Sequence, residues 1–141
     1  MESPATAADQ LTWPVEGGTR APYRVFTDPR IYEREQAQIF RGPHWNFVAL
    51  EAEIPNPGDY KSTFVGDTPV VVTRGGQGEL HCWVNRCAHR GAQICRELRG
   101  NQELFVCVYH QWSYDASGGL IAVPFRRGIA GKGGMPKEFD L

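Results

Sequence analysis

The stretch CAHRGAQICRELRGNQELFVCVYHQW, residues 87–112, decides how the chain is interpreted. It holds two short boxes, Cys87-Ala88-His89-Arg90-Gly91 and Cys107-Val108-Tyr109-His110-Gln111-Trp112. A single cysteine in a β-rich domain is usually a small buried residue, and a single histidine is usually a surface or satisfied core residue. Two close Cys/His pairs on turn-like segments instead predict a metal site. Its expected ligands are Cys87, His89, Cys107 and His110.

The mixed composition of each pair indicates which metal is bound. Zinc fingers usually pair cysteine with cysteine and histidine with histidine, with about two to five residues between them. Here each pair is mixed, and only Ala88 separates the ligands of the first. A mixed set suits a two-iron, two-sulfide cluster between two loops, with cysteines on one iron and histidines on the other. Neutral imidazoles in place of thiolates raise the reduction potential of such a cluster. Structural zinc remains the alternative.

The segments around the boxes predict a mainly β fold. Short β-rich runs separated by glycine, proline and asparagine turns are expected at 45–50, 60–65, 69–74, 79–85, 104–108, 112–115 and 120–123. Gly100-Asn101 is interpreted as one of these turns. This spacing is typical of a small antiparallel β sandwich or barrel, here with two cluster-binding loops.

One helix is expected before the β-rich part, at residues 28–40. Asp28 is a suitable cap, Pro29 suits the first helical position, and Gly42-Pro43 ends the helix. The chain of 141 residues is long enough for one domain. We therefore expect an N-terminal arm and helix at 1–42, a cluster domain at 43–128, and a linker at 129–141.

Composition excludes several classes of protein. Hydrophobic residues make up 41% and charged residues 22%, which is normal for a globular protein. A net charge of −1 and a pI near 6.4 give no general attraction to nucleic acid or to a membrane surface. Residues 1–10 do not form a secretory signal, so a cytoplasmic location is expected. In that reducing compartment Cys82 and Cys95 are interpreted as unpaired thiols rather than ligands.

The motif C-x-H-R-G followed by C-x-Y-H-Q-W-x-Y-D resembles the Rieske family. From Tyr23 to about Arg127 the chain is similar to the large (alpha) subunit of bacterial aromatic ring-hydroxylating dioxygenases, in the branch that acts on terephthalate, anthranilate and salicylate. The matching segments outside the boxes are Phe26-Thr27-Asp28-Pro29, Trp45, Pro57-Gly58-Asp59-Tyr60 and Val84-Asn85-Arg86.

The resemblance implies one-electron transfer through a Rieske 2Fe-2S cluster, within an oxidoreductase of aromatic hydrocarbon catabolism. The implied partners are a reductase or ferredoxin electron donor and other oxygenase subunits, alpha with or without beta, and neither nucleic acid nor membrane. The family's mononuclear Fe(II) lies in a larger C-terminal domain, and only His44 and His81 remain here to bind it. The chain alone is therefore expected to lack oxygenase activity. A free-standing Rieske ferredoxin and a zinc-stabilised binding module remain alternatives.

Four positions depart from related sequences. High-potential members carry a disulfide at positions that match Ala92 and Tyr109, and a hydroxyl donor at the position of Trp112. Gln111 stands where the family more often has glycine. Fewer hydrogen bonds to sulfur imply a potential near the low end of the Rieske range, about −150 mV.

Overall fold

The computed structural model describes residues 12–135, except Pro14 and Glu16. The chain divides into two compact units, Met1–Trp45 and Asn46–Leu141. The start of the expected arm and the end of the expected linker, residues 1–11 and 136–141, lie outside the described residues. Within the described part, no helix combines the length and the apolar character that crossing a bilayer requires.

The first unit is built around the expected helix. Helix α1 (Pro29–Glu35) starts after Asp28, whose Oδ1 accepts a hydrogen bond from the backbone N–H of Arg30 at 3.0 Å. The helix continues as a π-helical segment, η4 (Gln36–Phe40), which confirms the predicted range. It ends before Gly42, where a Cβ atom would lie only 2.0 Å from the carbonyl oxygen of Gln38. Two short 3₁₀ segments precede it, η2 (Gly17–Thr19) and η3 (Tyr23–Phe26).

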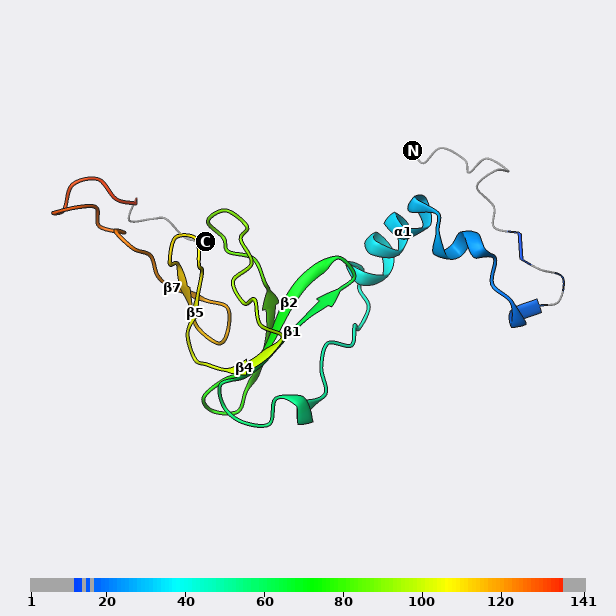
Figure 1. Cartoon of the computed structure of the whole chain (residues 1–141), viewed down its shortest axis with the longest axis horizontal. Coiled ribbons are helices and arrows are strands. Elements are labelled where there is room, and N and C mark those ends of the chain that lie inside the picture. The colour runs from blue at the N-terminus through cyan, green and yellow to red at the C-terminus, as the bar shows by residue number, and fades with distance from the viewer. Residues whose placement is uncertain (1–11, 14, 16, 136–141) are drawn as a thin grey trace. The chain divides into compact units, whose positions relative to one another are not determined.

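Two antiparallel sheets make up the second unit, which confirms the predicted fold class (Figure 1). The first has the order β3-β2-β1-β4, and the second has the order β5-β6-β7. The first sheet consists of β1 (Asp59–Val65), β2 (Thr68–Arg74), β3 (Leu80–Val84) and β4 (Arg99–Asn101). The second consists of β5 (Phe105–Val106), β6 (Ser113–Tyr114) and β7 (Leu120–Ala122). One 3₁₀ turn, η5 (Glu51–Glu53), precedes β1.

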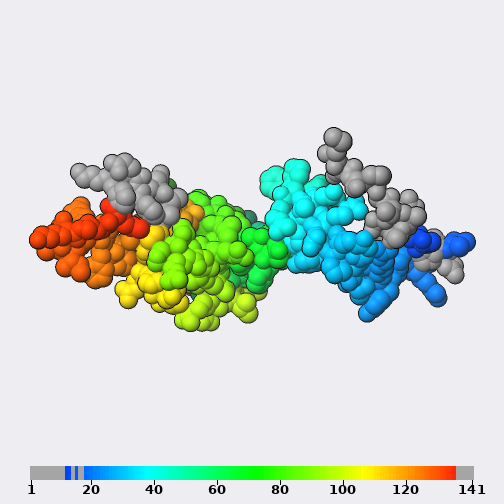
Figure 2. All heavy atoms as spheres, turned by 90° about the horizontal axis from the view of Figure 1, so that it is seen from above, coloured from blue at the N-terminus to red at the C-terminus, as the bar shows by residue number. Residues whose placement is uncertain are grey.

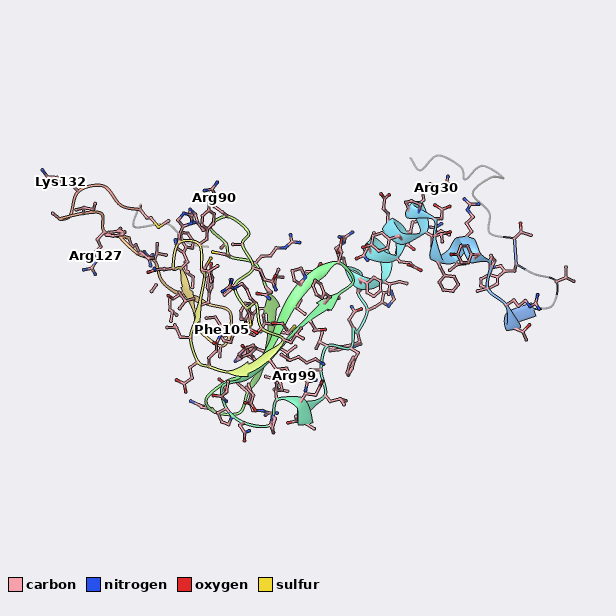
Figure 3. All side chains as sticks on the ribbon, viewed as in Figure 1. Arg30, Arg90, Arg99, Phe105, Arg127 and Lys132 are labelled. Carbon is pink, nitrogen blue, oxygen red and sulfur yellow. The ribbon has the colours of Figure 1, made fainter. Side chains whose placement is uncertain are left out.

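The core lies between the two sheets and is centred on Phe105. This residue is 1% exposed, and its ring makes edge-to-face contacts with those of Tyr60 and Trp83, at 5.4 Å and 5.2 Å between centroids. Figure 3 shows Phe105 between the sheets, and in Figure 2 the yellow and orange atoms of the second sheet lie against the green atoms of the first. Thr73 and Trp83 both donate hydrogen bonds to the carbonyl oxygen of Ala116, so the β6–β7 turn is tied to the first sheet.

Two of the predicted local structures are wrong. Residues 45–50 form no strand, although their composition favours one. Trp45 and Phe47 are 103% and 71% exposed, and no strand among the described residues pairs with this segment. Gly100-Asn101, interpreted as a turn, belongs instead to edge strand β4, where Gly100 pairs with Tyr60. A Cβ atom at Gly100 would lie 2.6 Å from the Tyr60 hydroxyl, so the glycine makes room for a core side chain.

Candidate metal centre

The two predicted ligand boxes form loops with the same backbone hydrogen bonds. In the first loop (residues 87–92), the N–H of Cys87 donates to the carbonyl of Ala92 at 2.8 Å, and the N–H of Gly91 donates to that of Cys87 at 2.7 Å. In the second loop (residues 107–112), Cys107 donates to Trp112 and Gln111 donates back to Cys107, both at 2.9 Å. Each loop therefore closes on the backbone of its own cysteine.

The fifth residue of each loop has a left-handed backbone. Gly91 has φ +72° and Gln111 has φ +57°, so both loops turn in the same way although only the first has glycine there. Glutamine at position 111, where the family more often has glycine, therefore adopts the same backbone conformation as Gly91 in the first loop. Its cost is backbone strain, because a side chain in the left-handed region is disfavoured by about 1–2 kcal/mol.

Gln111→Gly is expected to stabilise the chain by about 0.5–1 kcal/mol, since strain relief exceeds the greater unfolded-state entropy of glycine. Gly91→Ala is expected to destabilise it by about 1 kcal/mol through the backbone alone, because no atom lies within 4 Å of the added Cβ. Gly76→Ala is the control, with equally open space but without a positive φ. Urea denaturation of the four proteins measures the differences, and a cost at Gly76 equal to that at Gly91 would contradict the argument.

The structure brings the candidate ligands together as two pairs. Cys87 and Cys107 are 3% and 1% exposed and belong to the same buried core cluster. The imidazole rings of His89 and His110 lie 4.6 Å apart between centroids, at an angle of 72°. A buried thiol pair and an adjacent imidazole pair are the donor sets expected for the two irons of a mixed-ligand cluster.

His110 carries a polar atom that needs a partner. Its Nδ1 is buried and has no hydrogen-bond partner among the described residues. A buried polar atom left in this state costs about 1–3 kcal/mol, so such atoms are rare unless a ligand satisfies them. Metal coordination by Nδ1 would remove this cost, and the residues present therefore fit an iron–sulfur cluster.

No single point in the described part of the chain is surrounded by three or more histidine, cysteine, aspartate or glutamate side chains placed to hold one metal ion. A two-iron cluster does not require such a point, because each iron takes only two protein ligands and the sulfides complete its coordination.

Tyr114, which the sequence interpretation did not select, contacts the first loop. Its hydroxyl oxygen lies 3.1 Å from the Cys87 sulfur and accepts a hydrogen bond from the N–H of Ala88 at 3.0 Å. From the sequence, a hydroxyl donor to sulfur was considered only at position 112. In the structure strand β6 places Tyr114, the tyrosine of the W-x-Y-D motif, against Cys87 instead. Trp112 itself is 4% exposed and stacks on His89, with 4.7 Å between ring centroids and 13° between planes.

The surroundings of Cys87 favour its thiolate form. Burial raises the pKa of the thiol, but hydrogen bonds from the Tyr114 hydroxyl and from the backbone N–H groups of His89 and Arg90, together with the Cys107 contact, outweigh it and lower the pKa. A thiolate is the form that binds metal. The loop thus prepares its cysteine for coordination.

The other two cysteines lie outside this arrangement. Cys95 is 4% exposed, as predicted for a buried thiol, and its sulfur lies 3.3 Å from the Ser62 hydroxyl oxygen. Cys82 is exposed on strand β3. All four cysteines are free of disulfides.

Comparison with known proteins agrees with this geometry. Residues 44–131 match the family model described as the Rieske [2Fe-2S] domain. The chain is 64% identical over 133 residues to the large subunit of anthranilate 1,2-dioxygenase from Burkholderia cepacia, a match that covers 94% of this chain and 31% of that protein. It is 49% identical over 133 residues to the large oxygenase component of salicylate 5-hydroxylase from Ralstonia sp, covering 92% and 31%.

Solved structures show the same similarity. Naphthalene 1,2-dioxygenase from Rhodococcus sp. bound to indole superposes with a TM-score of 0.70 at 38% identity, over 79% of this chain and 25% of that one. The chain thus spans about a third or less of the proteins that it matches, 31% of the curated relatives and 25% of this structure.

Proposed function

The chain belongs to the Rieske [2Fe-2S] domain family, and from this premise we propose that it transfers single electrons as the N-terminal part of the large subunit of an aromatic ring-hydroxylating dioxygenase. The observation that carries the proposal is the buried thiol pair beside an imidazole pair in which Nδ1 of His110 has no partner among the described residues. When bound, the cluster supplies a one-electron redox couple at a potential above that of all-cysteine clusters.

We assign the four ligands by residue type. Cys87 and Cys107 would hold one iron through their thiolates, and His89 and His110 would hold the other through imidazole nitrogen. The lowered pKa of Cys87 supports the first assignment, and the unpartnered Nδ1 of His110 supports the second. Trp112 covers one face of the His89 ring and fixes its plane.

A partner would exchange electrons with a bound cluster on the histidine side. Both cysteines are buried, whereas His89 is exposed and His110 is half-buried. The imidazole edges are therefore the part of the site that a partner can approach closely. We infer that the donor is a reductase or ferredoxin and that the acceptor is a mononuclear Fe(II) held elsewhere in the oxygenase, by other alpha-subunit residues, with beta subunits as possible further components.

The substrate class is an aromatic acid, with anthranilate favoured over salicylate and terephthalate. The support is the 64% identity to an anthranilate dioxygenase subunit against 49% and 46% to salicylate and terephthalate enzymes. We assign the electron-transfer step to residues 43–128, with an arm and helix at 1–42 and a linker at 129–141. We further infer a cytoplasmic location, where ligand thiols stay reduced.

Analysis of the purified chain tests the proposal. We expect a coloured protein with two irons and two acid-labile sulfides per chain that takes up one electron on titration with dithionite. A colourless protein that contains zinc would overturn it. If dithionite reduces the cluster but an added dioxygenase reductase with NADH does not, the chain transfers electrons for a different enzyme system than a ring-hydroxylating dioxygenase.

Tyr114→Phe is expected to lower the reduction potential of the cluster. The variant removes a hydrogen-bond donor to the Cys87 sulfur, and such donors stabilise the reduced, more negative cluster. A difference of about 1 kcal/mol corresponds to about 40 mV for one electron. Tyr60→Phe, which removes the hydroxyl of another buried core tyrosine, is the control and should leave the potential unchanged. Mediated titration measures both, and equal shifts would contradict the assignment.

A further inference from the structure

Arg90 and Tyr109 join the outer ends of the two ligand loops. Arg90 follows His89 in the first loop, and Tyr109 precedes His110 in the second. The guanidinium of Arg90 donates a hydrogen bond to the Tyr109 hydroxyl oxygen at 3.3 Å, and its central carbon lies 5.3 Å from the centre of the Tyr109 ring. Figure 3 shows Arg90 at the end of its loop, away from the sheets.

A series of ring contacts links Tyr109 to both candidate histidines. The Tyr109 ring lies against the His110 ring, with 3.9 Å between centroids, and the His110 ring lies 4.6 Å from that of His89. The backbone hydrogen bonds described above close each loop on itself. The Arg90–Tyr109 contact instead connects one loop to the other, at the end where the imidazoles lie. Tyr114 makes a second connection on the thiol side, to Cys87 and Ala88.

We propose that Arg90 and Tyr109 act together as a positioning pair that holds the two histidine-bearing loops in register and raises the reduction potential of the cluster. The inference rests on the proposed function, and it adds a role for two residues that are not themselves ligands. Tyr109 limits the orientation of the His110 ring, and Arg90 holds Tyr109 by a hydrogen bond and a cation–π contact.

The positive charge of Arg90 decides the direction in which the pair shifts the reduction potential. Reduction adds one negative charge to the cluster, so a guanidinium fixed beside the histidines stabilises the reduced form and raises the potential. Arg90 and Tyr109 are both exposed, so water screens this effect and keeps it modest. We expect loss of the pair to change the one-electron equilibrium about twofold to fivefold, which is about 18–41 mV at 59 mV per tenfold change.

The test compares Arg90→Gln, Tyr109→Leu and the double variant with the unaltered chain. Both single variants are expected to lower the potential by this twofold to fivefold factor, to alter the EPR g-values of the reduced cluster and to speed loss of iron to a chelator. Because the residues act as a unit, the double variant should shift no further than the larger single variant. Arg86→Gln is the control, an exposed arginine next to Cys87 that should have no such effect.

Three results would overturn the inference. Additive shifts in the double variant would show two independent residues. A shift in Arg86→Gln equal to that in Arg90→Gln would show a general charge effect. Unchanged potentials in cluster-containing variants would show that the contact has no influence. Absence of a cluster from the unaltered chain would overturn the proposed function as well, so the two failures are distinguishable.

Discussion

Cys87→Ser and Cys107→Ser are each expected to abolish cluster binding, whereas Cys82→Ser and Cys95→Ser should leave iron and sulfide content unchanged. Both cysteines are buried, and in the proposed ligand assignment each variant removes one of the only two protein ligands of the same iron. A serine hydroxyl is a poor substitute, since it is far less readily deprotonated and is a harder ligand than sulfur. No other thiol is placed to replace it, because Cys95 already contacts Ser62 and Cys82 lies exposed on β3.

The control variants have different surroundings, which makes the comparison informative. Serine at position 95 can keep hydrogen bonds to the Ser62 hydroxyl and to the carbonyl of Glu97, both now made by the thiol. Serine at position 82 replaces an exposed side chain. Iron and sulfide analysis of the four purified variants, with circular dichroism as a check of folding, is the measurement. Loss of cluster from a folded Cys82→Ser protein would sink the ligand assignment.

The sequence predicted the fold most accurately where local signals and tertiary packing agree. Asp28 and Pro29 form a cap that needs no other part of the chain, and the helix begins where they predict. The runs at β1, β2 and β3 are rich in β-branched and aromatic residues and have turn residues between them, and all three strands are present. The fold class followed from the short β-rich runs and the turn residues between them. The cofactor followed from the Cys/His spacing, because that spacing reflects the chemistry of the cluster.

Errors arose where a segment depends on a neighbour that the sequence does not identify. Residues 45–50 have strand composition, yet a strand also needs a partner, and none pairs with them in the described structure. Gly100 was interpreted as a turn residue, but the glycine is needed because the Tyr60 side chain occupies the space that a Cβ atom would fill. Tyr114 was missed for the same reason, because its contact with Cys87 depends on how the second loop faces the first.

Asn85, which is not a candidate ligand, holds the ends of the segment that contains the first loop. It is fully buried, at 0% exposure, between strand β3 and Cys87. Its Nδ2 donates to the carbonyl of Cys95 at 2.8 Å, and its Oδ1 accepts from the N–H groups of Ile94 at 3.2 Å and Cys95 at 2.9 Å. One side chain therefore joins the two ends of the segment that carries Cys87 and His89.

Asn85→Ala is expected to destabilise the chain by about 3–5 kcal/mol. The variant leaves the buried N–H groups of Ile94 and Cys95 without their acceptor and removes one of the two donors to the Cys95 carbonyl. Each unsatisfied group costs about 1–3 kcal/mol, partly relieved by entering water. This loss is a large fraction of the stability of an ordinary domain, about 5–15 kcal/mol. Because the ends of the first loop would separate, we also expect faster release of iron than in the unaltered chain.

Gln93→Ala provides the matched control for Asn85→Ala. The Gln93 Nε2 donates to the same carbonyl of Cys95 at 3.0 Å, but this side chain is exposed. Its loss should cost less than about 1 kcal/mol, because water can replace it. Urea denaturation of both variants, with iron content followed in parallel, measures the difference. If Asn85→Ala is no less stable than Gln93→Ala, then the hydrogen bonds of Asn85 do not hold the loop, and its ends must be fixed by packing of Ile94 and Cys95 alone.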